Sequence, residues 1–262
     1  MSEAPQRTRV PFTPDESQSE SGTWPFRRET PLSTILITGA NRGIGLELAR
    51  QYAVAGDRVL ACCRMPEEAE ALQALAADHA EVSVHGVRVA EGESVTALAA
   101  ELADLPIDVL INNAGAPGPG FAHQTVLNMD FDGWAETFAV NSMAPLRVLQ
   151  ALLPNLKLSG SAKAITITSQ MGALSFDMPA AYAYCSSKAA VNKVMRLAAL
   201  DLKAEGIAVG LIHPGWVQTD MGGPKAQITP EESAAGIVSA IKGIDLANTG
   251  CFLKWNGEAH EW

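Results

Sequence analysis

The sequence predicts an α/β fold in which a doubly wound parallel sheet of about seven strands carries helices on both faces. From Ser33 onward, apolar segments of strand length alternate regularly with longer segments of helical character. The expected strands are rich in Val, Ile and Leu without a polar alternation, which is typical of strands buried on both faces. Because regular strand–helix alternation favours right-handed crossovers between parallel strands, the pattern predicts one doubly wound sheet.

The first half of the chain contains four expected strands, each a short apolar run bounded by turn-forming residues. The strand 34–38 leads into a glycine-containing turn and a helix that ends near Gly56. An Ala- and Glu-rich composition between the next two strands predicts a second helix. In chain order the later elements are a strand at 58–62, a helix at 67–77, a strand at 82–89, a helix at 94–102 and a strand at 108–112.

The second half continues the alternation with longer helices. Thr-Pro-Glu-Glu at 229–232 has the form of a capping box with proline at the first helical position, so it predicts the start of the last helix. In chain order the elements are a helix at 131–153, a strand at 163–168, a helix at 182–204, a strand at 207–212, a helix at 229–241 and a strand at 251–254.

Composition limits the classes of function. The chain has 262 residues, 47% of them hydrophobic, and its mean hydropathy of +0.08 fits one soluble domain over residues 32–262. Residues 1–31 lack apolar periodicity, which predicts a flexible N-terminal extension. No apolar run reaches the ~18 residues of a membrane span, so we expect no membrane association. A net charge of −10 without a basic run argues against a nucleic-acid partner.

The cysteines and histidines predict an intracellular protein without a metal. Four cysteines form no C-x-x-C pair, which is typical of reduced thiols, and the first residues show no signal-peptide pattern, so we expect a cytoplasmic protein. The five histidines have no metal-ligand spacing, so no metal site is expected.

Three glycines follow the first strand in Thr38-Gly-Ala-Asn-Arg-Gly-Ile-Gly45. Residues without a side chain let the backbone approach a pyrophosphate, and the N-terminus of the following helix offers N–H donors. An ordinary strand–helix turn is the alternative. The preceding strand and following helix favour phosphate binding.

Tyr184 and Lys188 lie four residues apart and therefore share one face of a predicted helix. A phenol titrates near pH ~10, and a nearby cation would lower that pKa and tune it for acid/base work. The alternative is a half-buried Tyr beside a solvated Lys. Tyr182 has no such partner, because Ser186 stands four residues after it.

These motifs occur together with Asn112-Asn-Ala-Gly115, Ser169 and Pro214-Gly215. In this order and spacing the chain resembles the short-chain dehydrogenase/reductase family, over about residues 33–262. The stretches at 41–48 and 213–223 are most similar to C-factor-type and small carbonyl-reductase-like members. The resemblance implies a Rossmann-type fold and a nicotinamide cofactor.

The resemblance also implies roles for single residues. Tyr184 would exchange a proton with the substrate oxygen, and Lys188 would hold the cofactor ribose and lower the pKa of Tyr184. Ser169 would bind the substrate carbonyl, and Asn141 would maintain a water-linked proton path to Lys188. Each of these two residues has a plainer alternative, as a strand-end hydroxyl and a helix-kink residue. The implied cofactor site comprises Gly39, Asn41, Arg42, Gly43, Ile44, Gly45, Arg64, Val89, Asn113, Ala114, Gly115, Tyr184, Lys188, Pro214, Gly215, Val217 and Thr219.

The residues after the second strand predict a preference for NADP(H), with NAD(H) as the other option. An acidic residue usually marks a cofactor without a 2′-phosphate, and Cys-Cys-Arg at 62–64 has none. Arg64 and Arg42 could clamp the phosphate, unless both are solvated. Arg88 stands where the family often has Asp, which leaves the adenine contact open.

We therefore expect an oxidoreductase that interconverts a carbonyl and an alcohol, with a cofactor-binding regulatory protein of the C-factor type as the alternative. The expected substrate site comprises Ser169, Gln170, Met171, Tyr184 and Trp216. The resemblance implies a homodimer or homotetramer that pairs through the helices at 131–153 and 182–204. The sequence does not identify the substrate.

Overall fold

The computed structural model describes residues 32–262, so the extension predicted for residues 1–31 lies outside the described part. Nine strands are found there: β1 (Thr34–Thr38), β2 (Arg58–Cys63), β3 (Val82–Gly86), β4 (Val109–Asn112), β5 (Gln124–Thr125), β6 (Asn128–Met129), β7 (Lys163–Ile167), β8 (Ala208–His213) and β9 (Cys251–Lys254). The α-helices are α1 (Gly43–Val54), α2 (Glu70–Asp78), α3 (Gly92–Glu101), α4 (Phe131–Phe138), α5 (Ala144–Ala151), α6 (Leu153–Lys157), α7 (Tyr182–Leu202) and α8 (Pro230–Lys242).

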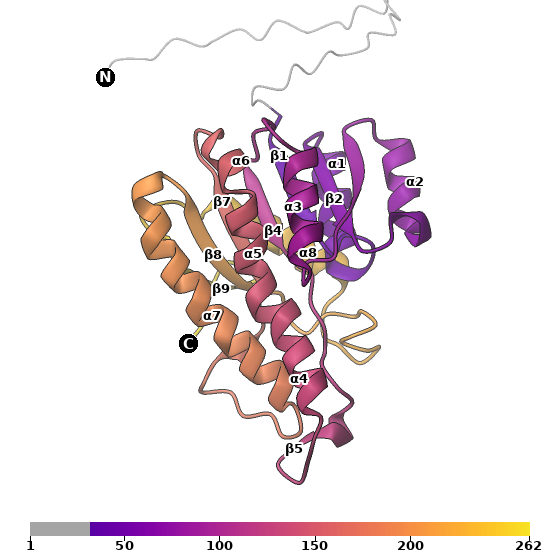
Figure 1. Cartoon of the computed structure of the whole chain (residues 1–262), viewed down its shortest axis with the longest axis vertical. Coiled ribbons are helices and arrows are strands. Elements are labelled where there is room, and N and C mark those ends of the chain that lie inside the picture. The colour runs from indigo at the N-terminus through magenta and orange to yellow at the C-terminus, as the bar shows by residue number, and fades with distance from the viewer. Residues whose placement is uncertain (1–31) are drawn as a thin grey trace, which may run out of the picture. The chain divides into compact units, whose positions relative to one another are not determined.

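Seven of these strands form one parallel sheet in the order β3-β2-β1-β4-β7-β8-β9. The chain fills one half of the sheet from β1 to β3 and then returns to β1, where β4 begins the other half (Figure 1). The predicted doubly wound sheet is thereby confirmed. In such sheets the reversal between β1 and β4 opens a crevice at the carboxyl ends of the strands.

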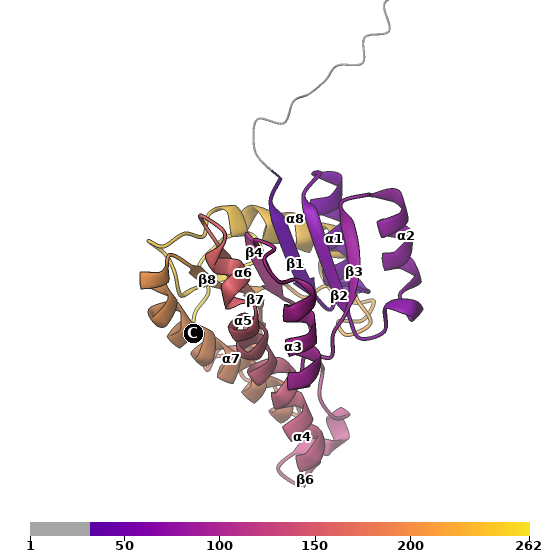
Figure 2. The same ribbon diagram turned by 45° about the horizontal axis from the view of Figure 1, so that its top comes forward.

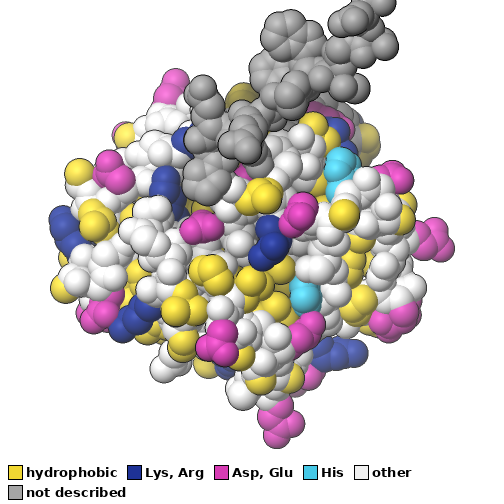
Figure 3. Space-filling view, turned by 90° about the horizontal axis from the view of Figure 1, so that it is seen from above, with side chains coloured by type: hydrophobic (Ala, Val, Ile, Leu, Met, Phe, Trp, Pro, Cys, Tyr) yellow, Lys and Arg dark blue, Asp and Glu magenta, His cyan; other side chains and the backbone are white. Residues whose placement is uncertain are grey.

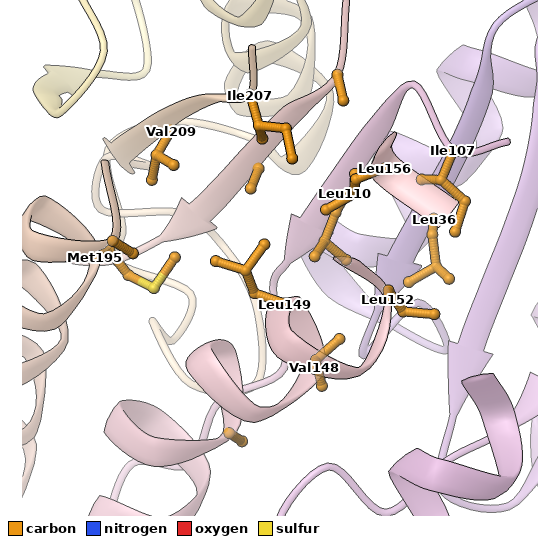
Figure 4. Packing of buried hydrophobic residues seen from close by; sticks show 14 of the residues in the cluster. Leu36, Ile107, Leu110, Val148, Leu149, Leu152, Leu156, Met195, Ile207 and Val209 are labelled. Atoms are coloured by element: carbon orange, nitrogen blue, oxygen red, sulfur yellow. The ribbon is translucent and has the colours of Figure 1, made fainter. Parts of the chain in front are cut away.

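Alternate side chains of each strand enter two separate cores. Leu36 and Leu110 point into a core with α3, α5 and α7, where they pack near Leu149 and Leu152 (Figure 4). Their neighbours along the chain, such as Ile37, belong to a second core with α1, α2 and α8. Both faces are therefore covered, which explains why apolar and polar residues do not alternate along the strands. Figure 2 shows the two helical layers from a second side.

The predicted helix at 131–153 is wrong in detail, because the structure divides it. A π-helical segment, Ala139–Met143, separates α4 from α5, and α6 follows as a separate short helix. Pro145 has no N–H to donate to the carbonyl of Asn141 four residues earlier, so the regular bonding pattern fails at that point. The widened turn places Asn141 inside the protein, where it is 1% exposed.

Other boundaries also differ from the prediction. The third strand ends at Gly86 rather than at residue 89, and Val87 and Val89 then turn back into the core. A 3₁₀ turn at Pro66–Glu68 precedes α2. The β5–β6 hairpin, whose strands have two residues each, was not predicted from the sequence. The predicted capping box is confirmed, since Thr229 Oγ1 accepts the Glu232 N–H at 3.2 Å.

The described surface carries mixed charge. In the face shown in Figure 3, Lys and Arg side chains stand apart from one another among Asp and Glu, and no continuous basic area is visible. None of the helices within residues 32–262 has the length and apolar character needed to cross a membrane. Within the same range, no group of His, Cys, Asp and Glu side chains is arranged to hold a metal ion.

Candidate active site

The glycine turn between β1 and α1 has the shape that phosphate binding needs. Gly39 and Gly43 have φ angles of +66° and +54°, which disfavour any residue with a side chain. A Cβ on Gly45 would lie 2.2 Å from the Gly39 carbonyl oxygen. Arg42 precedes α1 in extended conformation without a side-chain cap, and the first turn holds no acidic residue. The leading N–H groups of α1 are thus available to an anion.

The turn after β4 holds the glycine turn in place. Asn113 Nδ2 donates to the carbonyls of Thr38 and Gly39, each at 3.0 Å. The N–H groups of Asn113 and Ala114 both donate to Thr38 Oγ1 at 3.1 Å. The Asn113 backbone N–H and side-chain NH₂ are therefore both bonded within the protein and are not available as donors for the predicted cofactor contact. Sequence reasoning missed Thr38, although a Thr at the end of a strand beside the glycines was a visible signal.

A small hollow lies at the carboxyl ends of β1 and β4, next to the glycine turn. Its lining is small or apolar: Thr38, Val89, Asn112, Ala114, Val140, Ala144, Pro145 and Val148. Arg147 donates from Nη1 to the Val89 carbonyl at 3.2 Å and so fixes the segment after β3. Arg88 is exposed, and its backbone N–H donates to Ser94 Oγ at 2.9 Å. Two of the predicted cofactor residues, Val89 and Ala114, thus share one wall.

Of the two arginines predicted to hold the 2′-phosphate, one is already bound to an acidic side chain of the protein. Arg64 is exposed beside the end of β2. Arg42 is paired with Asp220, since its Nη1 lies 2.5 Å from the Asp220 Oδ2. The two side chains are 65% and 76% exposed, so water screens the pair. Sequence reasoning missed Asp220, which is 178 residues away from Arg42 in the chain.

The loop after β8 carries the Pro-Gly-Trp-Val-Gln-Thr segment to the glycine turn. Gly215 has a φ of +89°, and a Cβ there would lie 2.4 Å from Ile228 Cδ1. Val217 is buried, and a Cβ on Gly43 would lie 3.2 Å from Thr219 Cγ2. Cofactor residues predicted from the two ends of the chain are thus brought side by side.

Ser169, Tyr184 and Lys188 form one site. Ser169 follows β7 and its Oγ accepts the Met171 N–H at 3.1 Å, while the Tyr184 phenol on α7 lies beside the Ser169 side chain. The Lys188 Nζ lies 5.7 Å from the centre of the Tyr184 ring and donates to the Ile167 carbonyl at 3.1 Å. The prediction that Tyr184 and Lys188 share one face of a helix is thereby confirmed.

The pKa of Tyr184 corrects one sequence argument. Burial raises it to about 12, an effect that the hydrogen bond from Ser169 only partly offsets. Burial also lowers the pKa of Lys188 to about 8. The protein side chains by themselves therefore do not give the lowered Tyr184 pKa that the Tyr–Lys spacing predicted, because desolvation of the phenol outweighs the ammonium.

Asn141 is the fourth predicted catalytic residue, and its side chain is tied to the backbone. Its Oδ1 accepts the Ala116 N–H at 2.8 Å, and its Nδ2 donates to the Ala116 carbonyl at 2.8 Å and to Ser187 Oγ at 3.0 Å. A Cβ on Gly115 would lie 3.4 Å from Asn141 Oδ1 and 3.8 Å from Lys188 Nζ, so both groups border the same small space. This position beside Lys188 agrees with the predicted role.

Apart from Tyr184 on α7, the predicted substrate residues lie on two loops that follow the neighbouring strands β7 and β8. Gln170 and Met171 form a short 3₁₀ turn after Ser169, and Trp216 is 46% exposed with its Nε1 bonded to the Gly222 carbonyl. The same loops carry further exposed apolar side chains: Leu174, Phe176, Met178 and Met221. Tyr182 is 44% exposed, as expected for the Tyr without a Lys partner.

His213, at the end of β8, packs in the interior of the protein. It is buried, and its ring meets that of His260 edge to face at 5.5 Å between centroids. Burial and the positive charges nearby lower its pKa to about 4, so it is neutral at physiological pH.

Comparisons with known proteins agree with this geometry. A family model described as short chain dehydrogenase matches residues 33–229. C-signal of Myxococcus xanthus is 41% identical over 158 residues, which cover 60% of this chain and 93% of that protein. The 1-hydroxy-2-glutathionyl-2-methyl-3-butene dehydrogenase of Rhodococcus sp. strain AD45 is 32% identical over 244 residues, 88% of this chain and all of that one. The NADPH-bound carbonyl reductase from chicken fatty liver superposes with a TM-score of 0.82 at 33% identity, over 89% of this chain and 100% of that chain.

Proposed function

The chain belongs to the short-chain dehydrogenase family, and we propose that it is an NADPH-dependent carbonyl reductase in which Tyr184 is the acid/base. Hydride transfer with a nicotinamide cofactor is the chemistry of an oxidoreductase on this fold. The observation that carries the proposal is the position of the Tyr184 phenol beside both Ser169 and the buried Lys188 ammonium. Tyr184 and Lys188, on one face of α7, supply a proton donor and a cation, and Ser169, after β7, supplies a hydroxyl that can bind the substrate oxygen.

In the proposed mechanism a carbonyl oxygen binds between Ser169 and Tyr184. The hydride for the carbonyl carbon would come from the nicotinamide cofactor when it is bound. Ser169 donates a hydrogen bond that stabilises negative charge as it develops on the oxygen, and Tyr184 transfers its proton to that oxygen. Lys188, next to the ring, stabilises the resulting phenolate, and the space bordered by Gly115 and Asn141 is the route by which solvent returns the proton.

A preference for NADPH is part of the proposal. Support comes from the absence of an acidic residue at the end of β2, from the exposed Arg64 and Arg42, and from solved relatives that carry this cofactor. The test is a fluorescence titration of the protein with NADPH and, in parallel, with NADH. Binding of NADH weaker by about 30-fold, roughly 2 kcal/mol, supports the proposal. Equal affinities for the two cofactors would overturn the proposed preference for NADPH. If neither cofactor bound, the proposal that the protein is a reductase would be overturned.

We further propose a neutral, apolar carbonyl compound as substrate. The large exposed side chains on the two loops at the site are mostly apolar, and the exposed charged residues there are two acids, Asp177 and Asp220, and one base, Lys225. A substrate carboxylate would meet repulsion there. Turnover of aryl or alkyl ketones with little turnover of keto acids is the expected outcome of a substrate screen.

The assembly and location are proposals as well. Large apolar side chains are exposed along α4, the π-helical segment, α5 and α7: Phe131, Met143, Leu146, Leu197 and Leu200. We propose that they pair two copies of the chain, which would bury them. The four cysteines are all free thiols, two of them buried, which favours the cytoplasm.

A regulatory role without turnover, as the likeness to C-signal allows, makes a different prediction. A pure cofactor binder has no need of Ser169 or Tyr184. Biological activity that survives Tyr184→Phe but not Gly43→Asp, which blocks the glycine turn, would favour that role over the reductase.

A further inference from the structure

The β5–β6 hairpin has no part in the chemistry proposed above, yet one of its residues reaches the catalytic helix. Figures 1 and 2 place this hairpin beside α4 at the end of the molecule away from α6. Its tip is open, because Val126 and Leu127 are 82% and 93% exposed. Gln124 at the start of the hairpin is only 1% exposed. A buried glutamine needs partners for both its carbonyl and its NH₂ group.

The helix α7 begins without a cap of its own. The residue before it, Ala181, has no side-chain acceptor, and the first bond within the helix runs from the Cys185 N–H to the Ala181 carbonyl at 2.9 Å. The N–H groups of Ala183 and Tyr184 therefore require an acceptor from elsewhere in the protein. Tyr184 is itself the residue whose phenol must meet the substrate.

Gln124 provides that acceptor. Its Oε1 lies 3.0 Å from the Ala183 nitrogen and 3.4 Å from the Tyr184 nitrogen, 60 residues further along the chain. Its Nε2 donates to the Pro119 carbonyl, which fixes the orientation of the amide. A second hydrogen bond joins the first turn of α7 to α4, since Trp134 Nε1 donates to Ser186 Oγ at 3.0 Å.

We propose that Gln124 is a positioning residue that caps the catalytic helix from the hairpin and thereby holds the Tyr184 phenol against Ser169. The inference rests on the proposed reductase function. An amide suits this position better than the acidic residues that usually favour a helix N-terminus. A carboxylate at Gln124 would disfavour the phenolate of Tyr184 and so raise its pKa.

The test compares Gln124→Met with Gln124→Glu in the full-length protein. Gln124→Met keeps the length of the side chain and loses the acceptor, so kcat for ketone reduction should fall at least tenfold while the NADPH Kd stays within threefold. Gln124→Glu keeps the acceptor for the Ala183 N–H and loses only the donor to the Pro119 carbonyl, so kcat at its own optimum should fall less than in Gln124→Met. Its negative charge should move the acid limb of the pH profile for alcohol oxidation to higher pH. Gln150→Met, at an exposed position on α5, is the matched control.

A measurement without turnover separates failure of this inference from failure of the proposed function. The chain has three tyrosines, so ¹³Cζ-tyrosine NMR gives one resonance each for Tyr52, Tyr182 and Tyr184. Gln124→Met should shift or broaden the Tyr184 resonance and leave that of Tyr52 unchanged. An unchanged Tyr184 resonance would overturn the inference even if the wild type reduced no carbonyl. A kcat within twofold of an active wild type, or an unshifted profile in Gln124→Glu, would overturn it as well.

Discussion

Asp220→Asn should tighten the binding of NADPH and leave that of NADH unchanged. In the structure the Asp220 carboxylate holds the Arg42 guanidinium, which the proposal assigns to the 2′-phosphate. Binding of NADPH must therefore break or weaken this ion pair. NADH has no phosphate at that position and makes no such demand. Asp220 would thus reduce the preference for NADPH that the arginines create.

The size of the effect follows from the exposure of the pair. With side chains 65% and 76% exposed, the ion pair falls in the class that contributes about 0.2–1 kcal/mol. Releasing Arg42 from it should lower the NADPH Kd by about 1.4- to 5-fold. Since both partners are screened by water, the gain should be largest at low ionic strength and should shrink in added salt.

The assay is fluorescence titration of both variants with both cofactors at low and high salt. Glu81→Gln is the matched control, because it removes the same charge at a distant position. Glu81 is likewise an exposed acid paired with an arginine, Arg58, at 3.5 Å. An equal gain for NADH, or a gain no larger than that of the control, would refute the competition between Asp220 and the phosphate.

Three other perturbations test separate parts of the account. Gly45→Ala should abolish cofactor binding and cost about 1–3 kcal/mol of stability, because its Cβ would collide with the Gly39 carbonyl, whereas Gly160→Ala has open space and should be neutral in both calorimetry and titration. Lys188→Met should change the pH dependence of stability, because the pKa of Lys188 is about 8 in the folded protein and about 10.4 in the unfolded chain. As the pH rises from 8 towards 10, the wild type should therefore gain on the order of 1–2 kcal/mol of unfolding free energy relative to the variant. Unfolding free energies that run parallel over that pH range would contradict this. Leu200→Asp should convert a dimer into monomers in sedimentation, while Leu158→Asp, at another exposed leucine outside these helices, should not.

The parts of the site that the sequence predicted are those in which chemistry restricts the residue type. Gly39 and Gly43 need positive φ angles, and Tyr184 and Lys188 must share a helix face, so local spacing marked them as candidates and their occurrence together in the family's order selected them. The alternation of strands and helices likewise predicted the sheet, since burial on both faces leaves little freedom in composition.

Contacts between distant segments could not be predicted in this way. Gln124 and Asp220 act on partners 60 and 178 residues away, and an isolated polar residue in a loop has no pattern that reveals such a partner. The direction of the Tyr184 pKa was also beyond the sequence, because it depends on how deeply the phenol is buried. The break in the long helix was within reach, since Pro145 cannot complete the bond to Asn141.

The most direct test of the central claim is NADPH-dependent reduction of an apolar ketone by Tyr184→Phe and Tyr182→Phe, each with its NADPH Kd. Removing the proton donor at Tyr184 should lower kcat by about 10²–10⁴-fold with the Kd nearly unchanged, because the phenol acts on the substrate and not on the cofactor phosphates. Tyr182→Phe, the same change two residues away on the exposed side, should retain full activity. Undiminished reduction by Tyr184→Phe would contradict the mechanism.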